Sequence, residues 1–256
     1  MTISASASWL KKPGTTARYR LFCFPYAGGG ASAYYTWQAS FPSEIEICPI
    51  QLPGRESRIT ERPFDDLALL VQAIADVLLP YLEIPFAFFG HSMGTLISFE
   101  LARQLRRQNA PSPAHLFVGG HRGPQLPDPD PPTYHLPETE FVDSLRRFNG
   151  TPELVFQNAE LMQLMLPALR ADMTISETYS YTPEDPLDCA ISAFCGMQDS
   201  EASYDSMLAW REQTRGAFRI RLLPGDHFFL RSHQNLLLQA ISQDITKFLS
   251  LSAAKQ

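Results

Sequence analysis

The chain has 256 residues, of which 45% are hydrophobic and 19% are charged, a balance typical of a packed globular protein and not of a disordered chain. This length fits one large α/β domain, or one core domain that carries an insertion. The formal net charge is −6, and no block of Lys and Arg alternates with aromatic residues, so we expect no nucleic-acid partner.

The N-terminus and the apolar runs favour a cytoplasmic protein that does not enter a membrane. Residues 1–14, MTISASASWLKKPG, contain no apolar segment of the length found in secretory signals. The most apolar long run, Leu67 to Leu82, is interrupted by Asp76 and Pro80 and is too short to span a bilayer. The four cysteines form no CxxC pair, and we expect reduced, buried thiols at Cys23, Cys48, Cys189 and Cys195.

Short apolar runs alternate with helical patterns along the chain. The apolar runs predict buried strands at residues 19–25, 45–50, 85–89, 115–119, 190–196 and 218–223. Apolar residues three and four positions apart predict helices over residues 64–81, 93–108 and about 234–249. Strands that alternate with helices indicate βαβ units, so we predict an α/β fold with a mostly parallel sheet flanked by helices.

One region interrupts this alternation. Residues 123–137, GPQLPDPDPPTYHLP, are too rich in proline to form a regular element. Helical patterns follow over Glu138 to Phe148 and, after an N-cap predicted at Asn158, to about Tyr179. A helical excursion between two strands, entered through a rigid loop, is typical of a lid, although an ordinary helical layer of the core is the alternative.

The second of these helices is apolar on more than one face, which suits a lining for flexible apolar ligands. Met side chains adapt well to such ligands, so the candidate substrate-binding residues are Met162, Met165 and Met173. The predicted organisation is an N-terminal extension over 1–18, a core over 19–123 and 186–256, and a helical lid insertion over 124–185.

Residues 90–94 read Gly90-His91-Ser92-Met93-Gly94, a Gly-x-Ser-x-Gly pattern. The bare pattern occurs often by chance, but here a predicted strand precedes it and a predicted helix follows it. A nucleophile elbow needs this context, because its serine lies on a sharp strand-to-helix turn and its glycines let strand and helix approach closely. We therefore predict that Ser92 is a nucleophile, against the alternative of an ordinary turn residue.

A serine hydroxyl needs a base, which is usually a histidine oriented by a carboxylate, in the chain order Ser, Asp, His. His227 directly follows a predicted strand on a loop, where a base at the carboxyl edge of a parallel sheet is expected. Asp199 follows the preceding strand in the same way, three residues after Gly196. The residues that fit less well are His91, His115, His121, His135, His233, Asp188, Asp205 and Asp226.

Hydrolysis of an acyl group also needs two donors for the oxyanion. The backbone N–H of Met93, directly after the nucleophile, is one candidate. The loop after the first core strand, Pro25 to Gly30, should supply the other, and the N–H of Ala27 is best placed. A phosphate-binding loop is the rival interpretation, but the glycine spacing does not match it, and no HExxH-type metal spacing is present, so we expect no cofactor and no metal.

Several motifs together resemble the type II thioesterases of nonribosomal peptide and polyketide synthesis, over nearly the whole chain after about residue 18. They are FPYAGGG at 24–30, LPGRESR at 52–58, GHSMG at 90–94, NGTPE at 149–153, LRADM at 169–173 and GDHFFL at 225–230. The resemblance implies the α/β-hydrolase fold and a monomer that removes acyl groups from the phosphopantetheine arm of carrier domains. It implies Ser92, Asp199 and His227 as the triad, with Ala27 and Met93 as oxyanion donors.

The chain departs from the family pattern at three positions. Asp226 precedes the histidine where the family usually has Gly, Ser200 follows the aspartate where Pro is frequent, and His121 replaces a polar residue that is not histidine. Asp226 is a hypothetical modifier of the pH optimum. In the LPGRESR loop, Arg55, Glu56 and Arg58 serve either to dock a carrier or, as we favour, to brace the loop through salt bridges.

Two other functions stay open at this point. An esterase or serine acyltransferase for small soluble substrates would use the same residues, and it would act on free esters at least as fast as on a carrier. A catalytically silent α/β-hydrolase that serves as a binding module would fail to form a covalent adduct with a fluorophosphonate.

Overall fold

The computed structural model describes residues 9–148, 150 and 153–253. Within them, six strands form one sheet in the order β2-β1-β3-β4-β5-β6, and every neighbouring pair is parallel. This confirms the predicted parallel sheet. The strands are β1 (Tyr19–Phe24), β2 (Ile45–Pro49), β3 (Phe86–His91), β4 (His115–Gly119), β5 (Ala190–Gly196) and β6 (Phe218–Leu223).

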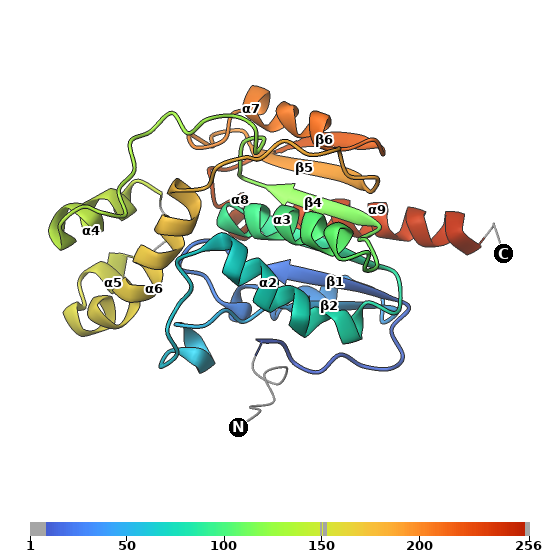
Figure 1. Cartoon of the computed structure of the whole chain (residues 1–256), viewed down its shortest axis with the longest axis horizontal. Helices are drawn as coiled ribbons and strands as arrows, with labels where there is room; N and C mark the ends of the chain where they lie inside the picture. The colour runs from blue at the N-terminus through green and yellow to red at the C-terminus, as the bar shows by residue number, and fades with distance from the viewer. Residues whose placement is uncertain (1–8, 149, 151–152, 254–256) are drawn as a thin grey trace.

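Helices cover both faces of the sheet (Figure 1). Successive side chains of a strand point to opposite faces, so Phe86 and Phe88 of β3 pack with one core cluster, and Ala87 and Phe89 pack with the other. Helices α2 (Leu67–Leu78) and α3 (Met93–Arg107) cover the first face, and α9 (Gln234–Ala253) covers the second. Strands buried on both faces explain the continuous apolar runs of the sequence.

The remaining elements in the core are short. They are η1 (Ala31–Tyr34), η2 (Trp37–Ser40), η3 (Glu56–Arg58), η4 (Leu79–Tyr81), α7 (Tyr204–Leu208), η5 (Ala209–Gln213) and α8 (Phe229–Ser232).

Three helices are inserted between β4 and β5 and lie beyond the carboxyl ends of the strands, on the left in Figure 1. They are α4 (Glu138–Arg146), α5 (Glu153–Phe156) and α6 (Ala159–Glu177). Asn158 caps α6 as predicted, because its Oδ1 accepts a hydrogen bond from the Leu161 N–H at 3.0 Å. Of the NGTPE motif, Asn149, Thr151 and Pro152 lie outside the described residues.

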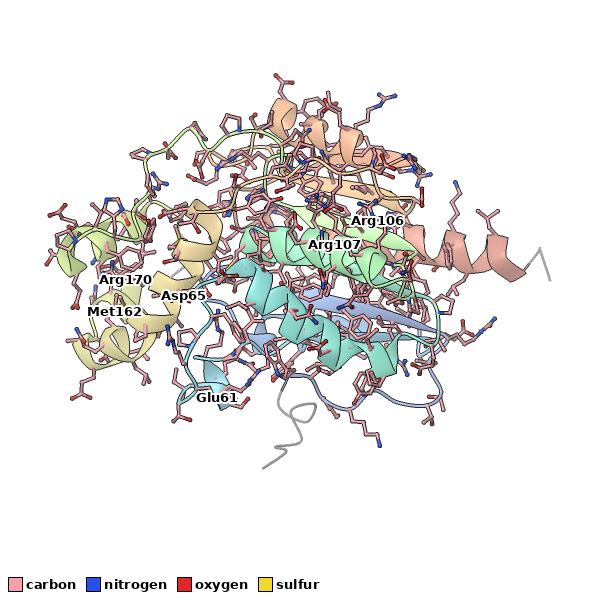
Figure 2. All side chains as sticks on the ribbon, viewed as in Figure 1. Glu61, Asp65, Arg106, Arg107, Met162 and Arg170 are labelled. Carbon is pink, nitrogen blue, oxygen red and sulfur yellow. The ribbon has the colours of Figure 1, made fainter. Side chains whose placement is uncertain are left out.

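The insertion has a small apolar core of its own, in which α4 and α6 face each other. Figure 2 shows Met162 and Arg170 in this part of the molecule, away from the sheet. The last turns of α6 return to the main core, where Ile175 is buried. The buried residues of the small core are Phe141, Leu145, Met162, Leu166, Leu169 and Met173.

The described part of the N-terminal extension, residues 9–18, packs on the main core. Trp9 is buried, its carbonyl accepts a hydrogen bond from the Gln51 N–H at 2.6 Å, and the Arg58 guanidinium lies 4.3 Å from its ring centroid. None of the described helices is both long and apolar enough to cross a membrane. All four cysteines are free thiols, and Cys189 alone among them is only partly buried.

Candidate functional site

Ser92 lies on a strained turn between β3 and α3. Its backbone has φ +52° and ψ −122°, a conformation that is costly for a residue with a side chain. The Ser92 N–H donates to the Gly119 carbonyl at 2.8 Å, which holds the turn in place. A Cβ on Gly90 would clash with the Gly94 carbonyl, and one on Gly94 would clash with the Phe24 carbonyl. The geometry is therefore that of a nucleophile elbow.

His227 and Asp199 lie on adjacent loops after β6 and β5 and form a buried pair. His227 Nδ1 is 3.1 Å from each carboxylate oxygen of Asp199. Asp199 Oδ1 also accepts hydrogen bonds from the Glu201 and Ala202 N–H groups, at 2.9 and 3.2 Å, so the carboxylate has a fixed orientation. Because Nδ1 faces the carboxylate, Nε2 on the other side of the ring is the nitrogen left for chemistry.

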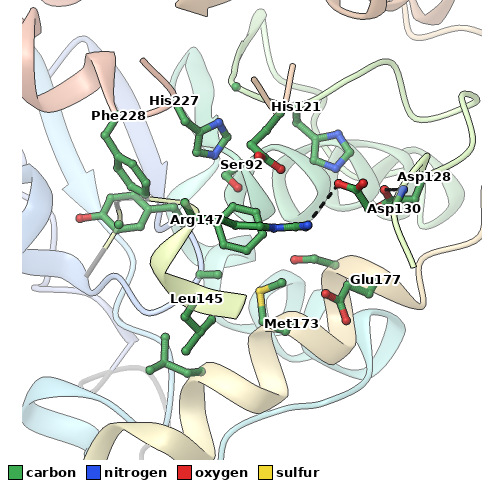
Figure 3. Close-up of a pocket in the computed structure, with 18 of the residues that line it drawn as sticks. Ser92, His121, Asp128, Asp130, Leu145, Arg147, Met173, Glu177, His227 and Phe228 are labelled. Atoms are coloured by element: carbon green, nitrogen blue, oxygen red, sulfur yellow. Dashed lines mark hydrogen bonds and ion pairs between the residues drawn. The ribbon is translucent and has the colours of Figure 1, made fainter. Parts of the chain in front are cut away.

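Ser92 and His227 line one pocket at the carboxyl edge of the sheet, together with Ala27 (Figure 3). Met173 and Leu145 of the insertion line its opposite side. The cavity is about 100 Å³. In the described residues no hydrogen bond joins Ser92 Oγ to His227, and such contacts often form only when substrate is bound.

The glycine-rich loop after β1 packs directly on the elbow. Its Gly29 N–H donates to the Tyr26 carbonyl at 2.8 Å, and Gly28 has φ +74°, which a residue with a side chain rarely adopts. These two observations describe a tight turn with Ala27 and Gly28 at its centre. Met93, the other predicted oxyanion donor, is the first residue of α3, where backbone N–H groups have no partner within the helix.

The LPGRESR loop braces the glycine-rich loop, as the favoured interpretation of the sequence predicts. Arg55 is buried and forms a bidentate pair with Asp172 of α6, at 2.6 and 2.8 Å. Glu56 accepts hydrogen bonds from the Ser32 N–H at the start of η1. Arg58 pairs with Glu61.

The three methionines predicted to bind substrate lie in different places. Met173 lines the pocket of Ser92. Met162 is buried against α4 inside the insertion, and Met165 lines a separate groove between α6 and the loop around Arg55. Neither Met162 nor Met165 lines the pocket of Ser92, and substrate contact by these two residues stays a prediction. Substrate contact by Met173 stays a prediction.

Charged residues at the pocket were not identified from the sequence. Arg147, after the end of α4, forms an ion pair of 3.3 Å with Asp130 of the proline-rich loop, and both line the pocket (Figure 3). No local spacing links these two segments, so the sequence carries no signal for the pair. Asp172 belongs to the LRADM motif, but the motif alone indicates no role for it.

The structure shows the contacts of the three residues that depart from the family pattern. Asp226 Oδ1 accepts the Phe228 N–H at 2.9 Å, and an effect of Asp226 on the pH optimum stays a prediction. Ser200 Oγ is 3.3 Å from a Glu201 carboxylate oxygen. His121 lines the pocket, and burial lowers its pKa to about 4.

His91, next to the elbow serine, is fully buried behind the predicted base. Its ring centroid is 5.1 Å from that of His227. Burial, with repulsion from His227, holds the pKa of His91 well below its usual value, so His91 is neutral. The described residues contain no group of three His, Cys, Asp or Glu that could hold a metal ion.

A second set of Ser, His and Asp lies buried within the core. Ser192 Oγ donates to Asp244 Oδ2 at 2.8 Å and is 2.9 Å from His115 Nε2, while Arg221 donates to both Asp244 oxygens. Here the serine lies between histidine and aspartate, so its proton is directed at the carboxylate and not at a base. Ser192 is fully buried, which indicates a structural role for this network.

Comparison with known proteins shows the family to which the chain belongs. The thioesterase domain family matches residues 19–248. The chain belongs to the thioesterase family. Gramicidin S biosynthesis protein GrsT of Aneurinibacillus migulanus is 51% identical over 216 residues, 84% of each chain. The type II thioesterase BorB from the borrelidin biosynthetic cluster superposes with a TM-score of 0.83 at 34% identity, covering 92% of this chain and 97% of BorB.

These similarities confirm the predicted family, fold class and enzyme class. The protein is a type II thioesterase, a serine hydrolase with the α/β-hydrolase fold. Another relative, named linear gramicidin dehydrogenase LgrE, from Brevibacillus parabrevis, is 47% identical over 246 residues, 94% of each chain. In this thioesterase the glycine-rich loop leads into η1, a 3-10 helix of four residues, and not into the α-helix whose N-terminus holds the pyrophosphate in a dinucleotide site.

Proposed function

We propose that Ser92, His227 and Asp199 form the catalytic triad of this thioesterase. His227 Nε2 takes the proton of Ser92 Oγ as the oxygen attacks the thioester carbonyl, and Asp199 stabilises the imidazolium that forms. Collapse of the tetrahedral intermediate breaks the carbon–sulfur bond, and His227 returns the proton to the thiolate that leaves. Water, activated by His227 in the same way, then hydrolyses the acyl-Ser92 ester. The observation that carries this proposal is the Asp199–His227 pair beside a pocket that also contains the elbow serine.

The N–H groups of Ala27 and Met93 are proposed to stabilise the oxyanion. Both belong to segments that meet at the elbow, since Gly94 approaches the Phe24 and Pro25 carbonyls closely. Removing one donor from such a hole typically lowers kcat by ~10²–10³.

The proposed substrates are acyl groups on the phosphopantetheine arm of carrier domains of a synthase, which would be its partner. GrsT is named for gramicidin S biosynthesis and BorB comes from the borrelidin cluster, which supports this class of substrate. We further propose that the protein acts as a monomer in the cytoplasm. Its four free thiols are compatible with a reducing compartment.

The segment 124–185 is proposed to be a lid over the core formed by 19–123 and 186–256. Leu145 and Met173 of this segment close the pocket on the side opposite Ser92. The cavity of about 100 Å³ is smaller than the ~300–1,000 Å³ of typical ligand sites. An acyl-pantetheine chain would therefore require movement of α4 and the residues that follow it, which line the pocket.

A comparison of substrates tests this function. Hydrolysis of one acyl group is measured on a loaded carrier domain, on the corresponding free thioester and on a free ester. We expect the highest kcat/KM for the carrier, and equal rates on carrier and free ester would contradict the carrier assignment. A fluorophosphonate adduct at Ser92, located by peptide mass spectrometry, separates an active hydrolase from a silent binding module.

A further inference from the structure

Asp172 of α6 is a buried carboxylate that binds the glycine-rich loop. Its Oδ2 accepts a hydrogen bond from the Gly28 N–H at 2.7 Å. The same oxygen is 2.6 Å from Arg55 Nη1, and Oδ1 is 2.8 Å from Arg55 Nη2. The Asp172 side chain is 1% exposed and that of Arg55 is 8% exposed, so neither charge is screened by solvent.

The Gly28 N–H belongs to the central peptide of the turn from Tyr26 to Gly29. This peptide shares the Ala27 Cα with the preceding planar peptide, which carries the Ala27 N–H, so the position of one limits the position of the other. With Gly28 at φ +74°, the N–H points to Asp172, and the hydrogen bond to a carboxylate is of the strong, charge-assisted type. Asp172 therefore anchors the peptide that joins Ala27 to Gly28, and through the shared Cα it restricts the peptide that carries the Ala27 N–H.

Arg55 and Leu169 complete this contact. Arg55 Nη1 also donates to the Gly29 carbonyl at 3.3 Å, so the guanidinium holds both the carboxylate and the loop. Leu169 lies one turn before Asp172 on α6 and packs so closely on Gly28 that a Cβ there would contact its Cδ2 at 2.6 Å. The inserted helix thus meets the turn through one apolar and one charged side chain on the same face.

A contribution to folding stability alone does not explain the buried ion pair of Arg55 and Asp172. Replacing a buried ion pair by apolar residues of similar size is often neutral or stabilising, because both charges lose their hydration. The carboxylate binds the N–H of the Ala27–Gly28 peptide, and Ala27 lines the pocket that contains Ser92. Its distinctive effect is on the geometry of the loop.

We propose that Asp172, held by Arg55, is a positioning residue that orients the oxyanion-hole turn. By fixing the Gly28 N–H it keeps the Ala27 N–H aimed at the developing oxyanion, and it couples the inserted helix α6 to this half of the hole. The inference rests on the role proposed above for Ala27.

The test uses two double variants that differ only in whether residue 172 can accept a hydrogen bond. Arg55→Met/Asp172→Leu removes both charges and leaves the Gly28 N–H without an acceptor. Arg55→Met/Asp172→Asn removes the same charges but keeps a side-chain oxygen within reach of that N–H. The matched control is Asp244→Asn, because Asp244 is also buried and binds an arginine through both oxygens, but it does not line the pocket.

We expect kcat of the Leu double variant to fall by about 10- to 100-fold, while KM changes by less than about threefold. This loss is smaller than the ~10²–10³ in kcat that follows removal of a whole oxyanion donor, because the Ala27 N–H is displaced and not removed. Affinity for an alkyl boronic acid, which forms a tetrahedral adduct in the hole, should fall in parallel. The Asn double variant should recover most of both losses, and Asp244→Asn should lower the melting temperature without lowering kcat in the folded protein.

Wild-type kcat in the Leu double variant would overturn the proposal, as would equal losses in the Leu and Asn variants or a loss confined to KM. If the Leu double variant does not fold, the single variant Asp172→Ala, which also removes the acceptor, is measured by the same readouts, and unchanged kcat and boronate affinity there would overturn the proposal. Fluorophosphonate labelling of wild-type Ser92 separates the two proposals: without labelling the triad assignment fails, whereas labelling with unaffected variants rejects only the role of Asp172.

Discussion

The two carboxylate oxygens of Asp199 lie at the same distance, 3.1 Å, from Nδ1 of His227. The carboxylate is fully buried and two backbone N–H groups hold it from the other side. Loops that follow neighbouring strands therefore meet in a pair that fixes which nitrogen of the imidazole faces the pocket.

Asp199→Asn should retain the fold and lose most of its activity. The amide oxygen can still accept from the Glu201 and Ala202 N–H groups, but it no longer stabilises a charged His227. We expect kcat to fall by up to ~10⁴, measured on an acyl-carrier substrate. Asp205→Asn, at an exposed aspartate, is the control and should match wild type. A loss of less than tenfold would argue against the orienting role.

Ser92→Ala and Ser192→Ala should have opposite consequences. The first removes the nucleophile and should lower kcat by a factor on the order of 10⁶ while the protein stays folded. The second removes a hydrogen-bond partner from Asp244 and His115 and should cost about 1–3 kcal/mol of unfolding free energy with kcat unchanged. Urea unfolding and steady-state kinetics on both variants check this, and a loss of activity at Ser192 would contradict the structural role.

Gly94→Ala should lower stability more than an alanine substitution at a glycine that has room for a Cβ. The added Cβ would clash with the Phe24 carbonyl and push the glycine-rich loop away from α3. We expect a cost of roughly 3 kcal/mol or more, together with loss of kcat. Gly14→Ala is the control, because a Cβ there meets its nearest atom at an ordinary 3.4 Å. Chemical denaturation should rank the two variants, and equal stabilities would contradict the close packing.

His115→Gln should weaken the dependence of stability on pH. Burial lowers the pKa of His115 to about 4, so the native protein keeps it neutral while the unfolded chain binds a proton from about pH 6.5 downward. Wild-type stability conferred by this group is therefore complete above pH 6.5 and is lost as the pH falls towards 4.

The free-energy difference between wild type and His115→Gln should shrink by up to about 3 kcal/mol between pH 7 and pH 4. His91 and His121 are present in both proteins, so their contributions to the pH dependence of the unfolding free energy cancel in this difference. Urea unfolding across this range measures the difference, and parallel curves would show that His115 does not contribute.

Local patterns in the sequence were sufficient to predict most of the fold. The continuous apolar run of a strand such as Phe86 to Phe89, and the cap at Asn158, depend on near neighbours in the chain. The elbow at Ser92 and the loops that carry Asp199 and His227 were found for the same reason, since a parallel sheet brings the carboxyl ends of its strands to one edge.

Contacts between distant segments were decided only by the tertiary structure. Asp172 meets Gly28 across 144 positions and Arg55 across 117, and no spacing in the sequence relates them. Likewise Met173 faces the pocket while Met165 lines another groove. Periodicity tells which residues share a face of an element, but the neighbour of that face depends on how the inserted helices pack on the sheet, and that packing is a property of the whole chain.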